Sequence, residues 1–291
     1  MPAPNFLIIG AQKSGSSWLA SHLGRHPEVY MPDSEVHFFD KAPHFEKGQT
    51  WYEAHFADAE AGQLIGEKTP DYLWTTSDGA EGHRAGAHER IHAMYPNAKL
   101  LVTLRNPVQR AVSALNHLIR TGRISPMESA DALLTGPKKH LTRPHGVLRK
   151  GFYHEQIQAY LEWFDHDQFL FLVFEEDIIA HPEDTLSRLR SFLGLSADFP
   201  ADATALNRKV NAHRLSAFGL LLRYYTPLPR LVVKGMDLPF PAHKITPSHD
   251  VMLRLYDLYA DANERLFDFL GRRPPSWLKS TYLQEHTSQA S

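Results

Sequence analysis

The chain has 291 residues, 43% of them hydrophobic, and its 31 Lys and Arg residues nearly balance its 33 Asp and Glu residues, for a formal net charge of −2. This length can bury a full core, and the composition excludes disordered, collagen-like and coiled-coil classes. The sequence contains no cysteine, which excludes disulfide frameworks, thiolate metal sites and cysteine nucleophiles. The balanced charge argues against a dedicated nucleic-acid-binding protein.

No targeting or membrane-spanning segment is visible in the sequence. The residues before the first apolar run carry no positive charge, and that run is too short for the core of a signal peptide. Other apolar runs fall well short of the ~20 residues that cross a bilayer. We therefore expect a cytoplasmic protein without a membrane span.

Apolar runs and helical spacing alternate along the chain. Strands are predicted at Phe6–Ile9, Leu64–Gly66, Lys99–Leu104 and Phe169–Phe174. Helices are predicted at Trp18–Leu23, Val108–Ile119, Pro182–Leu193 and Met252–Leu270. Because the apolar runs do not alternate with polar residues, they are typical of strands that are covered on both faces. The pattern predicts an α/β fold with a central parallel sheet and helices on both faces.

Two segments are too long to be plain connections. Ser125–Gly146 and Asn207–Pro247 are both rich in turn-forming and basic residues. Each is either a lid or substrate loop, or surface decoration.

The first strand leads into the loop Gly10–Trp18 and then into a helix. A glycine-bearing turn of this kind points backbone N–H groups at one spot, at the positive end of the helix dipole. The loop adds one lysine and three serine hydroxyls, which together predict a phosphate-binding site rather than a simple helix cap. The residues expected to hold phosphate are Gln12, Lys13, Ser14, Gly15, Ser16, Ser17 and Trp18.

This loop differs from that of the nucleoside triphosphatases. Their pattern, G-x-x-x-x-G-K-[ST], has lysine directly after the second glycine. Here Gly15 is followed by Ser16, and Lys13 lies two residues before the glycine. The cation is therefore at the opposite end of the loop, and the hydroxyl that binds Mg²⁺ lacks its usual lysine neighbour.

A second motif, Arg105–Ser113, follows the strand at 99–104. Together the two motifs resemble those of sulfotransferases that use 3′-phosphoadenosine 5′-phosphosulfate (PAPS). The resemblance implies that the loop binds the 5′-phosphosulfate and that Arg105 and Ser113 bind the 3′-phosphate. A guanidinium can make a forked contact to phosphate, and Ser113 follows two helical turns later.

Five further stretches resemble the carbohydrate branch of this family, the heparan sulfate and glycosaminoglycan type, and its bacterial relatives. They are Ser34–Phe39, Lys47–Tyr52, Gly66–Leu73, Gly151–Tyr153 and Phe174–Asp177. The resemblance runs from about Phe6 to Gly194 and more weakly to Leu278. It implies a P-loop-like sulfotransferase fold in a single domain, residues 1–291, with a core at about 5–200 and a cofactor-closing part at about 201–280.

The resemblance also implies roles in sulfuryl transfer to an acceptor hydroxyl or amine. Glu35 matches the proposed catalytic base, with His37 as its rival because the ordinary pKa of histidine is nearer neutrality. Lys13 would neutralise the departing adenosine 3′,5′-diphosphate. Lys68 would lie beside the transferring group, unless it is a solvated lysine paired with Glu67 or Asp71.

Other matches are less direct. Tyr153 is expected on the adenosine side of the site, although it and Phe152 fit equally as core aromatics. The family closes a late basic loop over the cofactor. Here that pattern is stretched, and the candidates for this role are Arg208, Lys209, Lys234 and Lys244.

No metal is expected, because no H-E-x-x-H or similar spacing occurs. His83, His88 and His92 lie near helical spacing, and we assign them to an exposed face.

Two other functions fit parts of the pattern. A P-loop kinase with ATP and Mg²⁺ would need a metal-binding acid, which Glu175 or Asp177 can supply. A non-catalytic binder of adenosine 3′,5′-diphosphate would need neither Glu35 nor Lys68.

The acceptor class stays open between a small molecule and a glycan. A polyanionic glycan favours a basic cleft. The residues that could form one are Lys138, Lys139, His140, Arg143, Arg149 and Lys150.

Overall fold

The computed structural model describes residues 2–76, 78–199, 215–226 and 243–287. In these residues five strands form one sheet, in the order β2-β3-β1-β4-β5, with every pairing parallel. The strands are β1 (Phe6–Gly10), β2 (Val29–Tyr30), β3 (Leu64–Lys68), β4 (Lys99–Leu104) and β5 (Phe169–Val173). The four predicted strands are confirmed. Strand β2 was not predicted, because two residues are too few to show a period.

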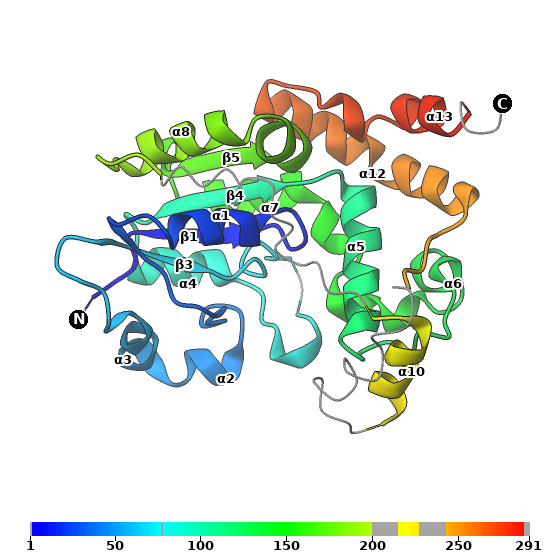
Figure 1. The fold of residues 1–291 in the computed structure, drawn as a ribbon, viewed down its shortest axis with the longest axis horizontal. Coiled ribbons are helices and arrows are strands. Elements are labelled where there is room, and N and C mark those ends of the chain that lie inside the picture. The colour runs from blue at the N-terminus through cyan, green and yellow to red at the C-terminus, as the bar shows by residue number, and fades with distance from the viewer. Residues whose placement is uncertain (1, 77, 200–214, 227–242, 288–291) are drawn as a thin grey trace.

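Helices cover both faces of the sheet (Figure 1). On one face Leu7 and Ile9 pack in a cluster with α4 (Ala87–Met94) and α7 (Tyr153–Leu161). On the other, alternate residues of β1 pack against α1 (Ser16–Leu23) and α8 (Pro182–Leu193). Because successive strand residues point to opposite faces, a strand with both faces covered must be apolar throughout. This arrangement confirms the predicted α/β fold.

A further helical group lies beside one end of the sheet (Figure 1). It consists of α5 (Pro107–Arg120), α6 (Ala130–Leu134), α10 (Ala217–Tyr225) and α12 (His249–Leu270), which share a buried cluster. Asn106 is the N-cap of α5, and its side chain accepts hydrogen bonds from the N–H groups of Val108 and Gln109. Proline at the first helical position has no N–H to leave unpaired there.

The segment 125–146 is folded onto this group through α6 and two short 3-10 turns, Lys139–Leu141 and Arg143–His145. Most of 207–247 lies outside the described residues. The remaining helices are α2 (Ala42–Phe45), α3 (Gly48–Glu53) and α13 (Lys279–Thr287). The other 3-10 turns are Ala54–Phe56, Ala80–Gly82, Arg149–Gly151, His166–Gln168 and Pro275–Trp277, and Phe174–Ala180 is a π-helix. Among the described helices, none has both the length and the apolarity to span a membrane.

Candidate active site

A cavity of about 620 Å³ lies at the carboxyl ends of the central strands. This is the edge at which open α/β sheets bind ligands. The predicted residues that line the cavity are Gln12, Lys13, Gly15, Ser16, Ser17, Trp18, Glu35, Arg105 and Ser113. Of the candidates for the late loop, Lys244 lines the same cavity, and Arg208, Lys209 and Lys234 lie outside the described residues.

The loop after β1 is shaped by one glycine. Gly15 has φ +100°, and a Cβ built there would lie 2.7 Å from Cδ2 of Phe174 and 2.9 Å from Cδ1 of Ile178. Only glycine adopts this conformation easily and leaves room for the Phe174 ring. Gly15 is also the N-cap of α1, and no side chain caps the first turn. The N-terminus of α1 can therefore offer its backbone N–H groups to an anion.

Two predicted nucleotide contacts lie behind the wall of the cavity. Ser14 and Tyr153 are both fully buried and do not line it. The Tyr153 hydroxyl donates to the backbone carbonyl of Arg105 at 2.8 Å. A direct contact of either side chain with the nucleotide remains a prediction, while Tyr153 supports the backbone of Arg105.

Cations crowd the side of the cavity that is formed by the loop and α5. The pKa of Lys13 is lowered to about 8, by burial first and then by the positive charges of Arg120 and Arg105. Burial first, and then the positive charges of Lys13 and Arg120, lower the pKa of His117 to about 4. Such crowding costs free energy in the absence of an anion and is relieved when one binds. This part of the cavity therefore suits a ligand with several negative charges.

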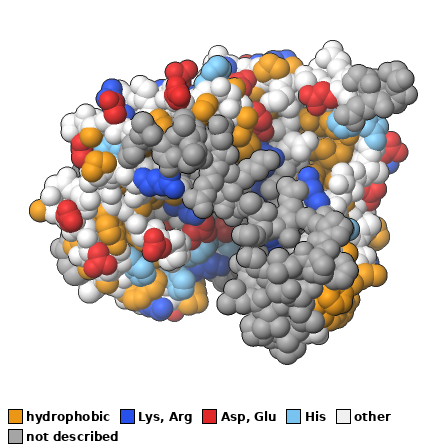
Figure 2. Space-filling model, viewed as in Figure 1, with side chains coloured by type: hydrophobic (Ala, Val, Ile, Leu, Met, Phe, Trp, Pro, Cys, Tyr) orange, Lys and Arg blue, Asp and Glu red, His pale blue; other side chains and the backbone are white. Residues whose placement is uncertain are grey.

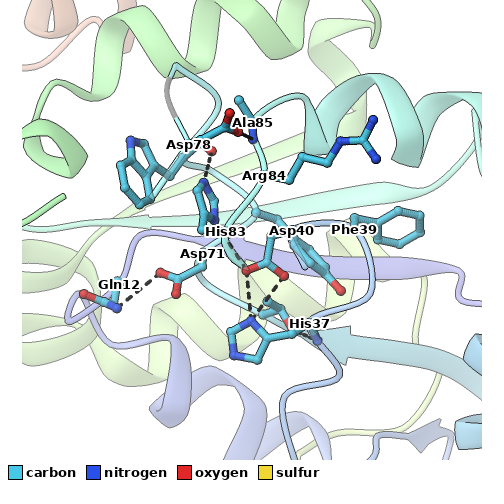
Figure 3. A network of polar contacts seen from close by, with 12 residues as sticks. Gln12, His37, Phe39, Asp40, Asp71, Asp78, His83, Arg84 and Ala85 are labelled. Atoms are coloured by element: carbon cyan, nitrogen blue, oxygen red, sulfur yellow. Dashed lines mark hydrogen bonds and ion pairs between the residues drawn. The ribbon is translucent and has the colours of Figure 1, made fainter. Parts of the chain in front are cut away.

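Glu35 lies between two proton donors. Lys68 Nζ is 2.9 Å from Glu35 Oε1, and His37 Nε2 is 3.4 Å from Glu35 Oε2. The other ring nitrogen of His37 contacts Asp40 at 2.9 Å, as Figure 3 shows. Lys68 therefore pairs with Glu35, and the alternative of a solvated lysine paired with Glu67 or Asp71 is wrong.

The charges and hydrogen bonds around Glu35 and His37 determine which of the two carries a proton. Burial alone would raise the pKa of Glu35, but hydrogen bonds from His37 and Lys68 lower it below its ordinary value. Burial would lower the pKa of His37, but Asp40 and Glu35 together raise it to about 10. At neutral pH Glu35 is therefore a carboxylate and His37 an imidazolium, so Glu35 is the group that can accept a proton.

Sequence reasoning missed how the backbone around Glu35 is held. Buried Glu67 accepts hydrogen bonds from the Thr69 hydroxyl and from the N–H of Val36. The Thr69 hydroxyl oxygen in turn accepts the N–H of His37 at 3.2 Å. His37 has φ +54°, in the left-handed region that non-glycine residues rarely adopt. The signal in the sequence was a glutamate that directly follows the apolar run 64–66.

A second cavity of about 130 Å³ adjoins the first, and both are lined by Gln12, Glu35, Asp71 and His117. Lys150 Nζ lies 2.8 Å from Asp71 Oδ1 and 4.6 Å from the centre of the Trp74 ring. Gln12 Nε2 donates to the same oxygen of Asp71 at 3.2 Å, as drawn in Figure 3. Glu35 thus stands where the two cavities meet.

The predicted basic cluster is divided between this cavity and the surface. Lys150 is buried and lines the second cavity. Lys138 forms a surface ion pair with Glu128 at 2.6 Å, and Arg149 pairs with Glu155 at 3.5 Å. In Figure 2 acidic, basic and His side chains lie side by side near the centre of the face that is shown. The described part of this cluster is therefore not one continuous basic cleft.

Comparison with known proteins identifies the family. The model of the family described as "Sulfotransferase family" matches residues 4–199. The chain belongs to the sulfotransferase family. It is therefore a transferase enzyme, as the two phosphate-site motifs predicted.

Relatives and solved structures agree. This sulfotransferase is 34% identical to heparan sulfate glucosamine 3-O-sulfotransferase 6 of Homo sapiens over 270 residues. The aligned region covers 92% of this chain and 72% of the human protein. The chain is 31% identical to heparan sulfate glucosamine 3-O-sulfotransferase 3B1 of Mus musculus, covering 92% of this chain and 64% of the mouse protein. The crystal structure of a sulfotransferase from Alicyclobacillus acidocaldarius superposes with a TM-score of 0.68 at 25% identity, covering 95% of this chain and 99% of that one.

The prediction that His83, His88 and His92 of this sulfotransferase lie on an exposed face is wrong. His83 and His88 are buried, and His92 is half-buried against Phe164. The His83 ring stacks on Trp74 with centroids 4.2 Å apart, and His88 lies 5.4 Å from the Tyr160 ring. The error arose because His83 precedes α4, and the α4 face that carries the other two packs against α7.

Two groups of side chains contain potential metal ligands. His37, Asp40 and Asp71 have ligand atoms within 4.8 Å of one another. However, His37 already bonds Asp40, and the Lys150 ammonium is paired with Asp71. A lysine ammonium beside a carboxylate opposes a second cation there.

The acids proposed for a kinase are similarly engaged. Asp177 is bound by Arg272 and by Arg188. Glu175 accepts hydrogen bonds from the N–H of Asn106 and from Trp277. Their donor partners give these carboxylates structural contacts and do not favour a Mg²⁺ site.

Proposed function

We propose that this sulfotransferase transfers a sulfuryl group from PAPS to a hydroxyl or amine of a carbohydrate acceptor, with Glu35 as the base. The observation that carries the proposal is the position of Glu35 at the junction of the two cavities. The large cavity would hold the nucleotide and the small one the acceptor. A base at that junction can reach the group that attacks.

The large cavity has the parts that a doubly phosphorylated nucleotide needs. Its loop, with Lys13 and the N-terminus of α1, would bind the 5′-phosphosulfate. Arg105 and Ser113, both lining the cavity from the end of β4 and from α5, would bind the 3′-phosphate. The sulfotransferase family as a whole supports PAPS as the co-substrate.

The chemistry is an in-line displacement at sulfur, analogous to phosphoryl transfer. The acceptor oxygen or nitrogen forms a bond to sulfur as the bond from sulfur to the 5′-phosphate oxygen breaks. The acceptor proton goes to Glu35, and the electron pair of the broken bond leaves on adenosine 3′,5′-diphosphate. Lys13 and Lys68 would stabilise charge on the transferring and leaving groups.

His37 takes a supporting role in this scheme. As an imidazolium between Asp40 and Glu35, it has no free site for the acceptor proton. It would orient the Glu35 carboxylate and keep it ionised before each turnover. Asp40, fully buried, would hold the ring in place.

A carbohydrate acceptor is supported by the relatives, which are named as sulfotransferases of heparan sulfate glucosamine. The small cavity has hydrogen-bonding and cationic side chains, among them Arg123 and Lys150, next to the Trp74 ring. Such a combination suits a hydroxylated ring with anionic substituents. The chain spans 64% of the mouse relative's length. The acceptor of this chain is therefore a proposal and is not taken over from that relative.

The test is release of adenosine 3′,5′-diphosphate from PAPS, with and without a heparan sulfate oligosaccharide, in the presence of EDTA. We expect release that depends on the acceptor and is unchanged by EDTA. Calorimetric titration with adenosine 3′,5′-diphosphate and with ATP–Mg²⁺ separates the alternatives. Binding of ATP–Mg²⁺ alone would support a kinase, and binding of the diphosphate without turnover on any glycan, amine or small-molecule acceptor would support a non-catalytic binder.

A further inference from the structure

Arg105 is held on several sides before any nucleotide arrives. Its Nη1 donates to the Lys13 carbonyl at 3.2 Å, and its guanidinium carbon lies 5.1 Å from the centre of the Phe174 ring. Its Nε is 3.8 Å from Glu175 Oε1. These contacts surround the Nε side and one corner of the guanidinium, while Arg105 still lines the large cavity.

Glu175 connects Arg105 to the rest of the molecule. Its Oε1 accepts the N–H of Asn106, the residue after Arg105, at 3.1 Å. Its Oε2 accepts Nε1 of Trp277 at 3.0 Å. One half-buried carboxylate therefore joins the end of β5, the turn after β4 and the C-terminal turn Pro275–Trp277.

The C-terminal turn contacts the same place a second time. Asn106 Nδ2 donates to the Ser276 carbonyl at 2.7 Å and to the Tyr256 hydroxyl at 3.1 Å. Asn106 is also the N-cap of α5, the helix that carries Ser113. The proposed 3′-phosphate site thus rests on contacts from a segment more than 150 residues later in the chain.

We infer that Glu175 is a positioning residue that sets the preference for a 3′-phosphorylated nucleotide, by fixing Arg105 with the help of Trp277. The inference rests on the proposed function, because it assumes that Arg105 meets the 3′-phosphate. Glu175 itself does not line the cavity. It acts by orienting a guanidinium whose forked geometry must match the phosphate.

Two nucleotides that differ only in the 3′-phosphate test this role. The dissociation constants of adenosine 3′,5′-diphosphate and of adenosine 5′-monophosphate are measured by calorimetry for the wild type and for Glu175→Gln. We expect the diphosphate to bind about tenfold more weakly, as when an orienting partner is removed from a metal ligand. We expect the affinity for the monophosphate to be unchanged, so the preference collapses.

A mutant cycle shows whether Glu175 acts through Arg105. In an Arg105→Ala background, Glu175→Gln should weaken binding of the diphosphate no further, because coupled residues are not additive. Glu176→Gln is the matched control, since Glu176 pairs with Arg272 at 3.5 Å and does not line the cavity. Trp277→Phe, which removes the indole donor and keeps a ring, should shift the preference in the same direction.

Three results would overturn the inference: wild-type affinity for the diphosphate in Glu175→Gln, a parallel loss of both nucleotides, or an additive effect in the Arg105→Ala background. A thermal melt of each variant identifies simple unfolding, and Trp277→Phe then decides the question. If the wild type binds neither nucleotide, the proposed function itself is wrong, and the role of Glu175 falls with it.

Discussion

Glu35 and Lys68 form an ion pair at 2.9 Å where the two cavities meet. Lys68 is the last residue of β3, and Glu35 lies in the loop that follows β2. The pair joins the proposed base to a cation that can face the transferring group. The ion pair and His37 lower the pKa of Glu35 and so keep it ionised, the form that can accept a proton. The same contacts oppose protonation of the carboxylate.

Replacing Glu35 with glutamine should remove the base and leave the nucleotide site intact. We expect turnover to fall by ~10²–10⁴-fold, the range typical of general-base catalysis. Binding of adenosine 3′,5′-diphosphate, measured by calorimetry, should stay close to wild type. Glu60→Gln, at an exposed position, is the control. Near-full turnover in Glu35→Gln would remove Glu35 from the mechanism.

Nucleotide binding should become weaker as the pH rises above 8. The pKa of free Lys13 is lowered to about 8, and a bound anion favours its charged form. Binding above that pH must therefore take up a proton, and the affinity falls as the pH rises. Lys13→Arg stays charged, so its affinity should not fall over this range. Calorimetry at pH 8.5 in buffers of different ionisation enthalpy measures the proton uptake, and equal heats in all buffers would contradict the prediction.

The second cavity should govern acceptor affinity. Lys150→Met keeps the bulk of the side chain but removes the charge beside Asp71 and Trp74. We expect KM for a heparan sulfate oligosaccharide to rise several-fold, with unchanged affinity for adenosine 3′,5′-diphosphate. Lys138→Met, which breaks only a surface ion pair, is the control. An equal change in KM in both variants would place the acceptor elsewhere.

Gly15→Ala should damage the loop in two ways. Alanine at φ +100° is strained, and its Cβ would lie 2.7 Å from the Phe174 ring. We expect a loss of more than ~1 kcal/mol in stability and weaker binding of adenosine 3′,5′-diphosphate. Gly62→Ala has a similar φ of +91° with nothing within 4 Å of the new Cβ, so it measures the strain alone. Equal losses of stability and of nucleotide affinity in both variants would show that the contact with Phe174 has no effect.

Glu67 should make the protein less stable as the pH rises from about 4.5 to about 7. Burial raises the pKa of Glu67 to about 7 from its ordinary value of 4.5. Between these values the folded state holds the proton and the unfolded state releases it, so the free energy of unfolding falls with rising pH. Glu67→Gln removes this contribution. The stability of the variant relative to wild type should therefore rise over this interval in denaturant titrations, and a constant difference would contradict the assignment.

Much of the architecture was readable from the sequence. Four apolar runs identified β1, β3, β4 and β5, because strands that are covered on both faces are built largely from apolar residues. The loop around Gly15 and the motif that begins at Arg105 were readable too, since each lies within a few residues of one strand end. Local periodicity was enough to predict the fold. The phosphate site was predicted from the chemistry of the loop and from the family resemblance, and its contacts with the nucleotide remain a prediction.

The partners of the side chains were decided by the tertiary structure. Lys68 pairs with Glu35 and not with its sequence neighbour Glu67, because successive residues of β3 point to opposite sides of the sheet. His83 stacks on Trp74 because the chain turns back between them. Glu175 accepts a hydrogen bond from Trp277 because the tertiary structure brings the C-terminal turn next to the end of β5. Such contacts depend on register and on packing between distant segments, whereas the periodicity of a sequence records only which face of an element is buried.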